Sequence, residues 1–267
     1  MSKQPPGAPP PPPVQRIRLR YTKRGRLRFT SHRDIARVFE RALRRAQVPI
    51  AFSAGFSPHP KISWVGAAAT GVASEAEYVE IHLAERRSPE DVRRALDASL
   101  PDGIDLVEAV EAEPGTSLPD RVQASSWQIA LAEVALADLE RAVERFLASE
   151  AIEVERMTKN GKRVFDTRSA VVAMRASQGE GCAILSVVVQ HVTPAVRPDD
   201  VLTGLRLVSD LATPVPPAAT RLAQGPLTAE GEVGDPLAPD RLAAGHSGAG
   251  QGATRQVDEA AGAELPS

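Results

Sequence analysis

The chain has 267 residues, a formal net charge of −2 at pH 7 and a single cysteine. One cysteine excludes an internal disulfide, a thiolate-held iron–sulfur cluster and a cysteine-rich zinc site. No stretch of the sequence approaches the ~20 apolar residues that a membrane span requires, and the first residues lack the apolar core of a signal peptide. We therefore expect a cytoplasmic protein with no membrane partner.

The two ends of the chain differ in composition from the rest. Residues 1–13 contain seven prolines, and residues 221–267 contain eight glycines and no aromatic residue. Neither segment can bury enough apolar surface to offset the entropy of ordering it. We expect a disordered proline-rich start over residues 1–14 and a disordered acidic tail over residues 213–267. The chain between these ends is long enough for two compact units of about 100 residues each.

The small net charge hides a strong asymmetry. Residues 16–48 hold twelve lysines and arginines against two acidic residues, a net charge of +10. Residues 221–267 hold three arginines against seven acidic residues, a net charge of −4. A basic start and an acidic end can pair with each other, so part of this asymmetry can be neutralised within the molecule.

The first elements follow from hydrophobic periodicity. Residues 16–30 alternate between apolar and basic side chains on both sides of a TKRG turn, which predicts a β-hairpin with one buried face. Ser31 then predicts a helix N-cap, with Asp34 three residues further on. Apolar residues at helical spacing follow over residues 35–46, and Pro49 ends the predicted helix.

The rest of the first half completes a compact unit. Residues 50–56 and 79–83 alternate as strands, residues 88–100 predict a helix that begins at Ser-Pro-Glu, and residues 104–110 predict a final strand. The order β-α-β-β-α-β is typical of a ferredoxin-like sandwich with helices on one face of the sheet. We assign this unit to residues 15–112.

A similar pattern follows a linker predicted over residues 113–124. The second unit, residues 125–212, has predicted strands and helices in a comparable order, with Asn160-Gly161 as a tight turn between two strands. Its last helix begins at Pro198. The sequence therefore predicts an α+β fold of two ferredoxin-like units in tandem.

The alternation of the first strand places its arginines on the face that the core does not use. Like charges on neighbouring strands repel, and a bound polyanion such as RNA would offset that repulsion. The alternatives are pairing with carboxylates of the same chain, the acidic tail included, or contact with an acidic partner protein. The expected nucleic-acid contacts are Arg16, Arg18, Arg20, Arg26, Arg28, Arg33 and Arg37.

Two histidines stand in motifs that suit anion binding. His32 follows the predicted N-cap at a helix start, and His59 lies between two prolines in the run GFSPHPK. An imidazole near neutral pH can also act as a general base on a ribose hydroxyl. An ordinary helix cap and a rigid loop, with Phe56 packed in the core, are the structural alternatives. The predicted pocket comprises Ser31, His32, Asp34, Ser53, Gly55, Phe56, Ser57, His59, Lys61 and Tyr78.

No metal or cofactor site is expected. His32, His59, His82 and His191 are too scattered for a metal-ligand motif, and Cys182 at a strand start is typical of a small buried residue. The chain also contains no P-loop, GxGxxG, GxSxG or HExxH motif.

Several motifs together resemble one family. They are YTK (21–23), LRFTSHRD (27–34), ERALRRA (40–46), FSAGFSPHPKIS (52–63), Gly71 and EY (77–78). These runs are similar to the radical SAM-linked protein family, a domain of unknown function found alone or fused behind a cobalamin-binding radical SAM domain. Its members usually carry leucine where this chain has Arg33. The matching motifs span roughly residues 16–83, and the general pattern continues to about residue 210.

The resemblance implies an accessory role beside a separate radical SAM enzyme, because Cys182 alone cannot hold the cluster that generates the radical. We expect a stand-alone member that binds RNA through its basic first unit, with tRNA as one candidate. Binding without catalysis is favoured over an enzymatic role. One alternative is a metal-independent endoribonuclease that uses His32 or His59 as acid or base, with Lys61 or Arg33 beside the phosphate. Another is a protein–protein adaptor.

Overall fold

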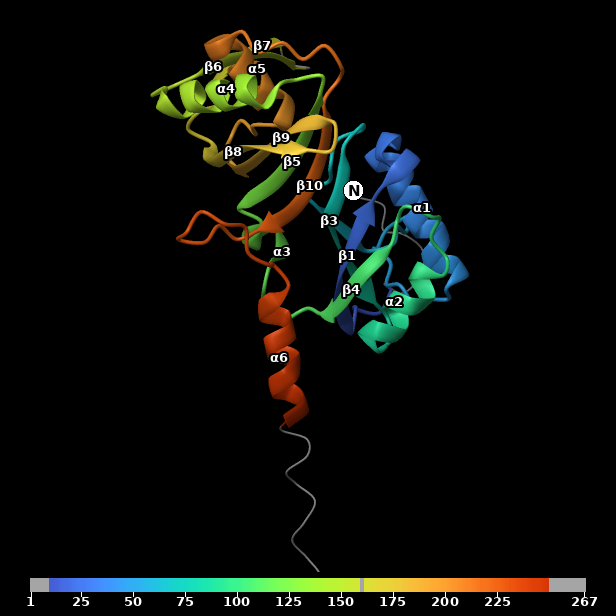
Figure 1. Cartoon of the computed structure of the whole chain (residues 1–267). Helices are drawn as coiled ribbons and strands as arrows, with labels where there is room; N and C mark the ends of the chain where they lie inside the picture. Colours follow the sequence, from blue (N-terminus) through green and yellow to red (C-terminus); the bar gives the residue numbers. More distant parts are fainter. Residues whose placement is uncertain (1–9, 159–160, 250–267) are drawn as a thin grey trace, which may run out of the picture.

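The structure is a computed structural model that describes residues 10–158 and 161–249 (Figure 1). These residues form ten β-strands, six α-helices and one 3₁₀ helix, so the predicted α+β class is confirmed. Seven strands form the path of one mixed sheet, and an eighth pairs with a strand on that path. The predictions made for residues 1–9, for Asn160 and for residues 250–267 lie outside the described residues.

The first half of the fold is built on four antiparallel strands. Strand β1 pairs with β3 along one edge and with β4 along the other, and β2 pairs with β3, which gives the strand order β4-β1-β3-β2. The elements are β1 (Gln15–Lys23), the 3₁₀ helix η1 (Gly25–Phe29), α1 (His32–Arg45), β2 (Ile62–Val65), β3 (Ala73–Leu83), α2 (Pro89–Asp97) and β4 (Leu106–Glu111).

The predicted alternation of β1 places its apolar side chains in the core. Ile17, Leu19 and Tyr21 are buried on the face of the sheet that α1 and α2 cover. Helix α1 adds Ile35 and Phe39 to the same cluster. Each such side chain stabilises the fold by about 1.5–3 kcal/mol when it leaves water, so this face fixes where both helices lie.

The second half repeats the strand order of the first. Its main sheet has the order β10-β5-β9-β8, again antiparallel, and β6 pairs with β7 in a separate two-stranded sheet. The elements are β5 (Ala124–Ala132), α4 (Leu136–Ala148), β6 (Glu153–Thr158), β7 (Gly161–Asp166), β8 (Val171–Gly179), β9 (Cys182–Gln190), α5 (Pro198–Ser209) and β10 (Ala218–Gly225).

Strand β10 joins the two halves (Figure 1). It pairs along its length with β5, and Thr220 and Arg221 also pair in parallel with Ala73 and Ser74 of β3. Two further helices pack nearby, α3 (Leu118–Arg121) and α6 (Ala238–Ala249). Residues 113–124, predicted as a linker, therefore contain a helix and the first residue of β5.

The predicted disordered tail is wrong over residues 213–249. This segment contains β10 and α6. Strand β10 pairs with β3 and β5, which lie much earlier in the sequence. Leu237 at the start of α6 is buried with Leu118 of α3 and Tyr78 of β3. The low overall hydrophobicity of the tail concealed these few buried positions.

The predicted hairpin over residues 16–30 is also wrong. Both edges of β1 are already occupied by β3 and β4, so no position remains for a second hairpin strand. Gly25, with φ of +54°, turns the chain into η1 instead. The strand predicted over residues 50–56 is reduced to isolated bridges at Ile50 and Phe52.

Candidate functional site

Two of the three arginines of β1, Arg16 and Arg18, are neutralised inside the molecule. Arg18 is fully buried, and its Nε donates to Glu80 Oε2 at 2.9 Å. Its Nη1 donates to both carboxylate oxygens of Asp240 in α6, at 2.8 Å, and its Nη2 donates to the Thr116 carbonyl at 2.9 Å. The prediction that Arg18 lies on an open face is therefore wrong, because α6 and the residues around α3 cover that face.

Arg16 and Arg20 extend the same row. Arg16 pairs with Glu80 at 3.4 Å and donates to the carbonyls of Glu113 and Thr116. Arg20 is half-buried, between Tyr78 and Glu108 on the neighbouring strands, and its Nε has no hydrogen-bond partner among the described residues. Arg16 and Arg18 follow the alternative prediction, because they pair with carboxylates of the same chain, one of which, Asp240, lies in the predicted tail.

The exposed positive charge lies on α1 instead. Arg33, Arg37, Arg41 and Arg44 follow a spacing of four, four and three residues, so they lie along one side of the helix, opposite its buried stripe. We call these four exposed residues the basic helix surface. Exposed Arg45 lies beside it, and α1 as a whole has five arginines against two acidic residues, a net charge of +3.

Few carboxylates oppose this surface. Arg37 pairs with Asp34 at 3.3 Å, whereas Arg33, Arg41 and Arg44 form no ion pair with any residue that the structure describes. Glu40 lies on the same side of the helix, but only its backbone carbonyl contacts an arginine, Arg44. The basic helix surface is thus largely unneutralised, in contrast to the β1 row.

The start of α1 is an ordinary helix cap. Ser31 Oγ accepts the Asp34 backbone N–H at 3.3 Å and donates to the Asp34 carboxylate at 2.7 Å, which confirms the predicted N-cap. Ser31 and Asp34 therefore supply each other's hydrogen-bond partners. His32 is exposed, and its ring meets Trp64 of β2 edge-on, with 5.2 Å between the ring centroids.

The run GFSPHPK forms a braced surface loop before β2. The Ser53 backbone N–H donates to the His59 carbonyl at 2.9 Å, and the His59 N–H donates back to Ser53 Oγ at 3.0 Å. Gly55 and Ser57 are exposed between them, and the His59 side chain points to solvent rather than to a positioning partner. Lys61 is half-buried where the loop joins β2.

The aromatic residues depart most from the prediction. Phe56, a predicted pocket residue for which a place in the core is the alternative, is 66% exposed, so the core alternative is wrong; Phe29, expected on the buried face of the hairpin, is 60% exposed. Tyr78 was placed in the pocket, but it is buried on the opposite face of β3 with Val65 and Leu118. The predicted pocket is thus divided among three places: Ser31, His32 and Asp34 lie at the start of α1, the residues from Ser53 to Lys61 lie in the loop before β2, and Tyr78 lies on the opposite face of β3.

Arg26 and Arg28 lie in η1, directly before α1. Arg26 is exposed, and Arg28 is half-buried with its guanidinium 4.7 Å above the centroid of the Phe29 ring. The Arg28 carbonyl accepts the Gly71 N–H at 2.7 Å, which holds η1 against the loop before β3.

A buried ionic cluster at the joint of the two halves was missed by the sequence analysis. Glu77 of β3 accepts hydrogen bonds from Arg221 of β10 and from the Ala68 N–H. Lys23 donates to the Ala69 carbonyl at 3.2 Å. Burial lowers the pKa of Lys23, and the nearby Glu77 carboxylate opposes this shift. These contacts hold residues 66–72 and fix β10 against β3. In the sequence, they are indicated only by the presence of Lys23 and Glu77 in the motifs that resemble a known family.

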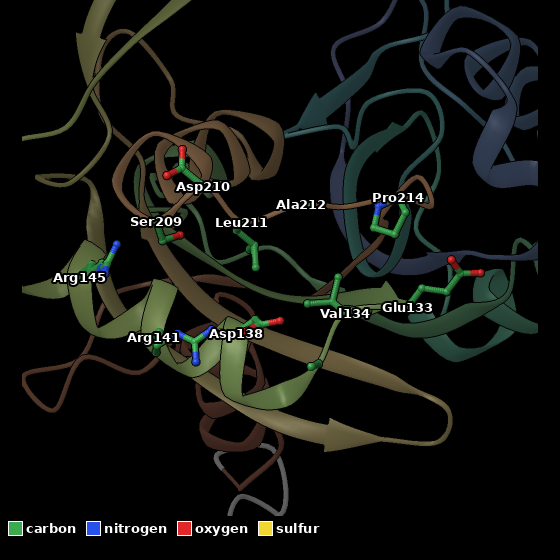
Figure 2. A pocket seen from close by; sticks show the side chains of 11 residues that line it. Glu133, Val134, Asp138, Arg141, Arg145, Ser209, Asp210, Leu211, Ala212 and Pro214 are labelled. Atoms are coloured by element: carbon green, nitrogen blue, oxygen red, sulfur yellow. Dashed lines mark hydrogen bonds and ion pairs between the residues drawn. The ribbon is translucent and has the colours of Figure 1, made fainter.

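A cavity of ≈ 470 Å³ lies at the other end of the molecule, between the start of α4 and the end of α5 (Figure 2). Its lining includes Arg141 and Arg145 but also three carboxylates, so it has no net preference for an anion. None of the predicted site residues lines it.

Within residues 10–158 and 161–249, no group of three or more His, Cys, Asp or Glu side chains is placed to hold a metal ion. Over the same residues, no helix is both long and apolar enough to cross a bilayer.

Comparison with known proteins gives one clear match. The model of a family described as an uncharacterized protein conserved in bacteria (DUF2344) matches residues 16–198. No curated protein matches the chain. Among solved structures, the encapsulated DyP-type peroxidase from Mycobacterium smegmatis aligns at 12% identity and a TM-score of 0.19, over 82% of this chain and 94% of that chain. Ferric DtpA from Streptomyces lividans aligns at 11% identity and a TM-score of 0.21, over 90% and 96%. TM-scores this low carry no argument about fold or chemistry.

Proposed function

The chain belongs to the DUF2344 family of bacterial proteins, and we propose that it binds RNA through the basic helix surface of its first half. The observation that carries this proposal is the contrast between two rows of arginines. On β1, Arg16 and Arg18 are paired with Glu80 and Asp240, whereas Arg33, Arg41 and Arg44 on α1 are exposed and have no carboxylate partner among the described residues.

Electrostatics explains why such a row favours a polyanion. Unpaired like charges along one side of a helix repel, by a few tenths of a kcal/mol for each pair that is four residues apart. A strand of phosphates removes this repulsion and releases condensed counterions, which makes binding both tight and salt-dependent. Phosphate contacts of this kind position a nucleic acid and carry little sequence information.

The remaining parts of the proposal rest on pattern and resemblance. The repeated strand order supports two ferredoxin-like units in tandem, a fold that supports RNA binding in other proteins. The resemblance to the radical SAM-linked family supports an accessory role beside a separate radical SAM enzyme in the cytoplasm. Binding without catalysis is favoured over RNA cleavage because, in the part of the chain that the structure describes, no carboxylate or hydroxyl forms a hydrogen bond that orients the ring of His32 or His59.

The test compares two variants with equal loss of charge. In one, Arg33, Arg37, Arg41 and Arg44 are each replaced by glutamine; in the control, exposed Arg86, Arg94, Arg141 and Arg175 are replaced in the same way. Binding of fluorescent RNA is measured by anisotropy between about 50 and 200 mM salt. We expect the first variant to lose affinity and to show a plot of log K against log salt that is shallower by about 3.

Other outcomes point to the alternatives. Equal effects of both variants would mean that the binding is unspecific and that the basic helix surface is not the site. Cleavage of the RNA that His32→Ala abolishes would favour the nuclease. Binding only to an acidic protein would favour the adaptor.

A further inference from the structure

Resting on the proposed function, we propose that the RNA bound is single-stranded, with unpaired bases stacking on Phe29, which precedes α1, and on Phe56, in the loop that follows it. The basic helix surface then contacts the phosphates of the same strand. This inference concerns strand type, which the arginines alone do not determine, because phosphates are common to single strands and duplexes.

The distribution of aromatic side chains supports the inference. The chain has only six phenylalanines, two tryptophans and two tyrosines. All ten lie in the described residues, and those that are classed as exposed are Phe29, Phe52 and Phe56. An exposed phenylalanine forfeits the stabilisation that its burial would supply, so exposed phenylalanines on both sides of a basic helix indicate a binding surface.

The two phenylalanines lie on the segments that precede and follow α1. Phe29 ends η1, two residues before the N-cap Ser31. Phe56 lies in the loop after α1, which is closed at its base by the bridge between Phe52 and Pro60 and is held there to His82 near the end of β3. A strand that follows the basic helix surface along α1 therefore runs from the segment of Phe29 toward the loop of Phe56.

The backbone that carries each phenylalanine is held in place. The hydrogen bond from the Gly71 N–H to the Arg28 carbonyl fixes η1, and the reciprocal pair between Ser53 and His59 closes the loop around Phe56. Two prolines further restrict that loop. Less conformational entropy is lost on binding when the segments are already ordered.

The chemistry of the two rings discriminates between strand types. Every base offers a π-face, and stacking on an aromatic side chain needs that face to be free. In an A-form duplex the bases are stacked on one another and the major groove is too narrow for side chains, so Phe29 and Phe56 would find no partner. The Arg28 guanidinium over the Phe29 ring adds a third stacking layer of the kind that RNA-binding surfaces use.

The experiment uses the full chain, fluorescent oligouridylate as the single strand and an RNA duplex of equal length. The test variant carries Phe29→Ala and Phe56→Ala, and a control carries Leu207→Ala on α5, where the leucine is 62% exposed. We expect the test variant to bind oligouridylate about tenfold more weakly or worse, with an unchanged salt slope, and the control to bind normally. Phe29→Trp with Phe56→Trp should restore binding, because tryptophan also stacks.

The outcomes separate this inference from the proposed function. If the Phe29→Ala, Phe56→Ala variant binds oligouridylate like the native chain, or if the native chain prefers the duplex, single-strand recognition is wrong while RNA binding stands. If the native chain binds neither RNA at low salt, the proposed function itself is wrong. Circular dichroism and urea unfolding of every variant check that the exposed substitutions leave the fold intact. Capture of an acidic protein through Phe29 and Phe56, without RNA, would also overturn the inference.

Discussion

Arg18 and Asp240 lie 222 positions apart in the chain, and their fully buried side chains form a two-oxygen ion pair at 2.8 Å. Asp240 also accepts from Arg121 at 2.8 Å and from the Glu113 N–H at 3.0 Å. One carboxylate of α6 therefore satisfies groups from β1, α3 and the segment between β4 and α3. The helix that follows the second half of the fold is in this way bound to the first.

Asp240→Asn should destabilise the protein by about 3 kcal/mol, because it leaves the buried guanidinium of Arg18 without its main counter-charge. Urea unfolding measures the effect. Glu144→Gln is the control, since Glu144 is exposed on α4 and forms no ion pair with any described residue. Equal unfolding free energies for the two variants would show that the Asp240 pair contributes little.

Gly66→Ala should cost more stability than Gly25→Ala, although the two glycines have nearly equal φ angles of +55° and +54°. Both substitutions place alanine in the left-handed region, at about 1 kcal/mol each. A Cβ on Gly25 would meet no atom within 4 Å, whereas one on Gly66 would overlap Oε1 of the buried Gln224.

The same comparison has an internal control. Moving Gln224 also disturbs its hydrogen bond to the Ala76 carbonyl, so we expect about 1–2 kcal/mol beyond the Gly25 value. The excess should disappear when Gly66→Ala is made in a Gln224→Ala background, measured as a double-mutant cycle of urea unfolding. Additive effects of the two substitutions would contradict the clash.

Local pattern was sufficient to predict the elements whose partners are near in sequence. The alternation of Ile17, Leu19 and Tyr21 and the stripe of α1 both reflect which face meets the core, and the Ser31 cap is a contact over three residues. The pattern also placed Arg16 and Arg18 on the opposite face of β1. The pattern could not show that α6 covers that face, because α6 comes from the far end of the chain and contacts β1 only in the tertiary fold.

The same limit explains the aromatic residues. Leu27 and Phe29 alternate as a strand would, and only the occupation of both β1 edges by β3 and β4 excludes that strand. Once η1 forms in its place, Phe29 turns to solvent. The position of the exposed aromatic side chains therefore could not be predicted from spacing alone.

Removal of residues 214–267 should prevent cooperative folding of the chain. Without β10 the edge of β5 is unpaired, without Arg221 the buried Glu77 loses its ion pair, and without Asp240 the buried Arg18 keeps only Glu80 as a counter-charge. Size-exclusion chromatography and thermal unfolding of the shortened chain test this. A monomer that melts like the full chain would show that β10 and α6 are dispensable.

His82 should make the protein less stable as the pH falls from 7 to 5. The residue lies on β3, where burial lowers its pKa; the Glu80 carboxylate, 3.3 Å from its Nε2, opposes this, and the charges of Arg16 and Lys61 add to the lowering. Its Nδ1 is buried without a partner among the described residues. The folded protein therefore resists protonation of His82 in a range where the unfolded chain, with a histidine pKa of about 6.5, accepts the proton.

Because the unfolded state binds more protons, the free energy of unfolding decreases as the pH drops through 6.5 toward the lowered pKa of the folded state, and it is unaffected above that range. His82→Gln removes this contribution, so the variant should lose less stability than the native chain between pH 7 and pH 5. Urea unfolding of both proteins at several pH values across this interval measures the difference, and the shared contributions of the buried carboxylates and of His191 cancel in the comparison. Parallel pH profiles would show that His82 titrates alike in the folded and unfolded states.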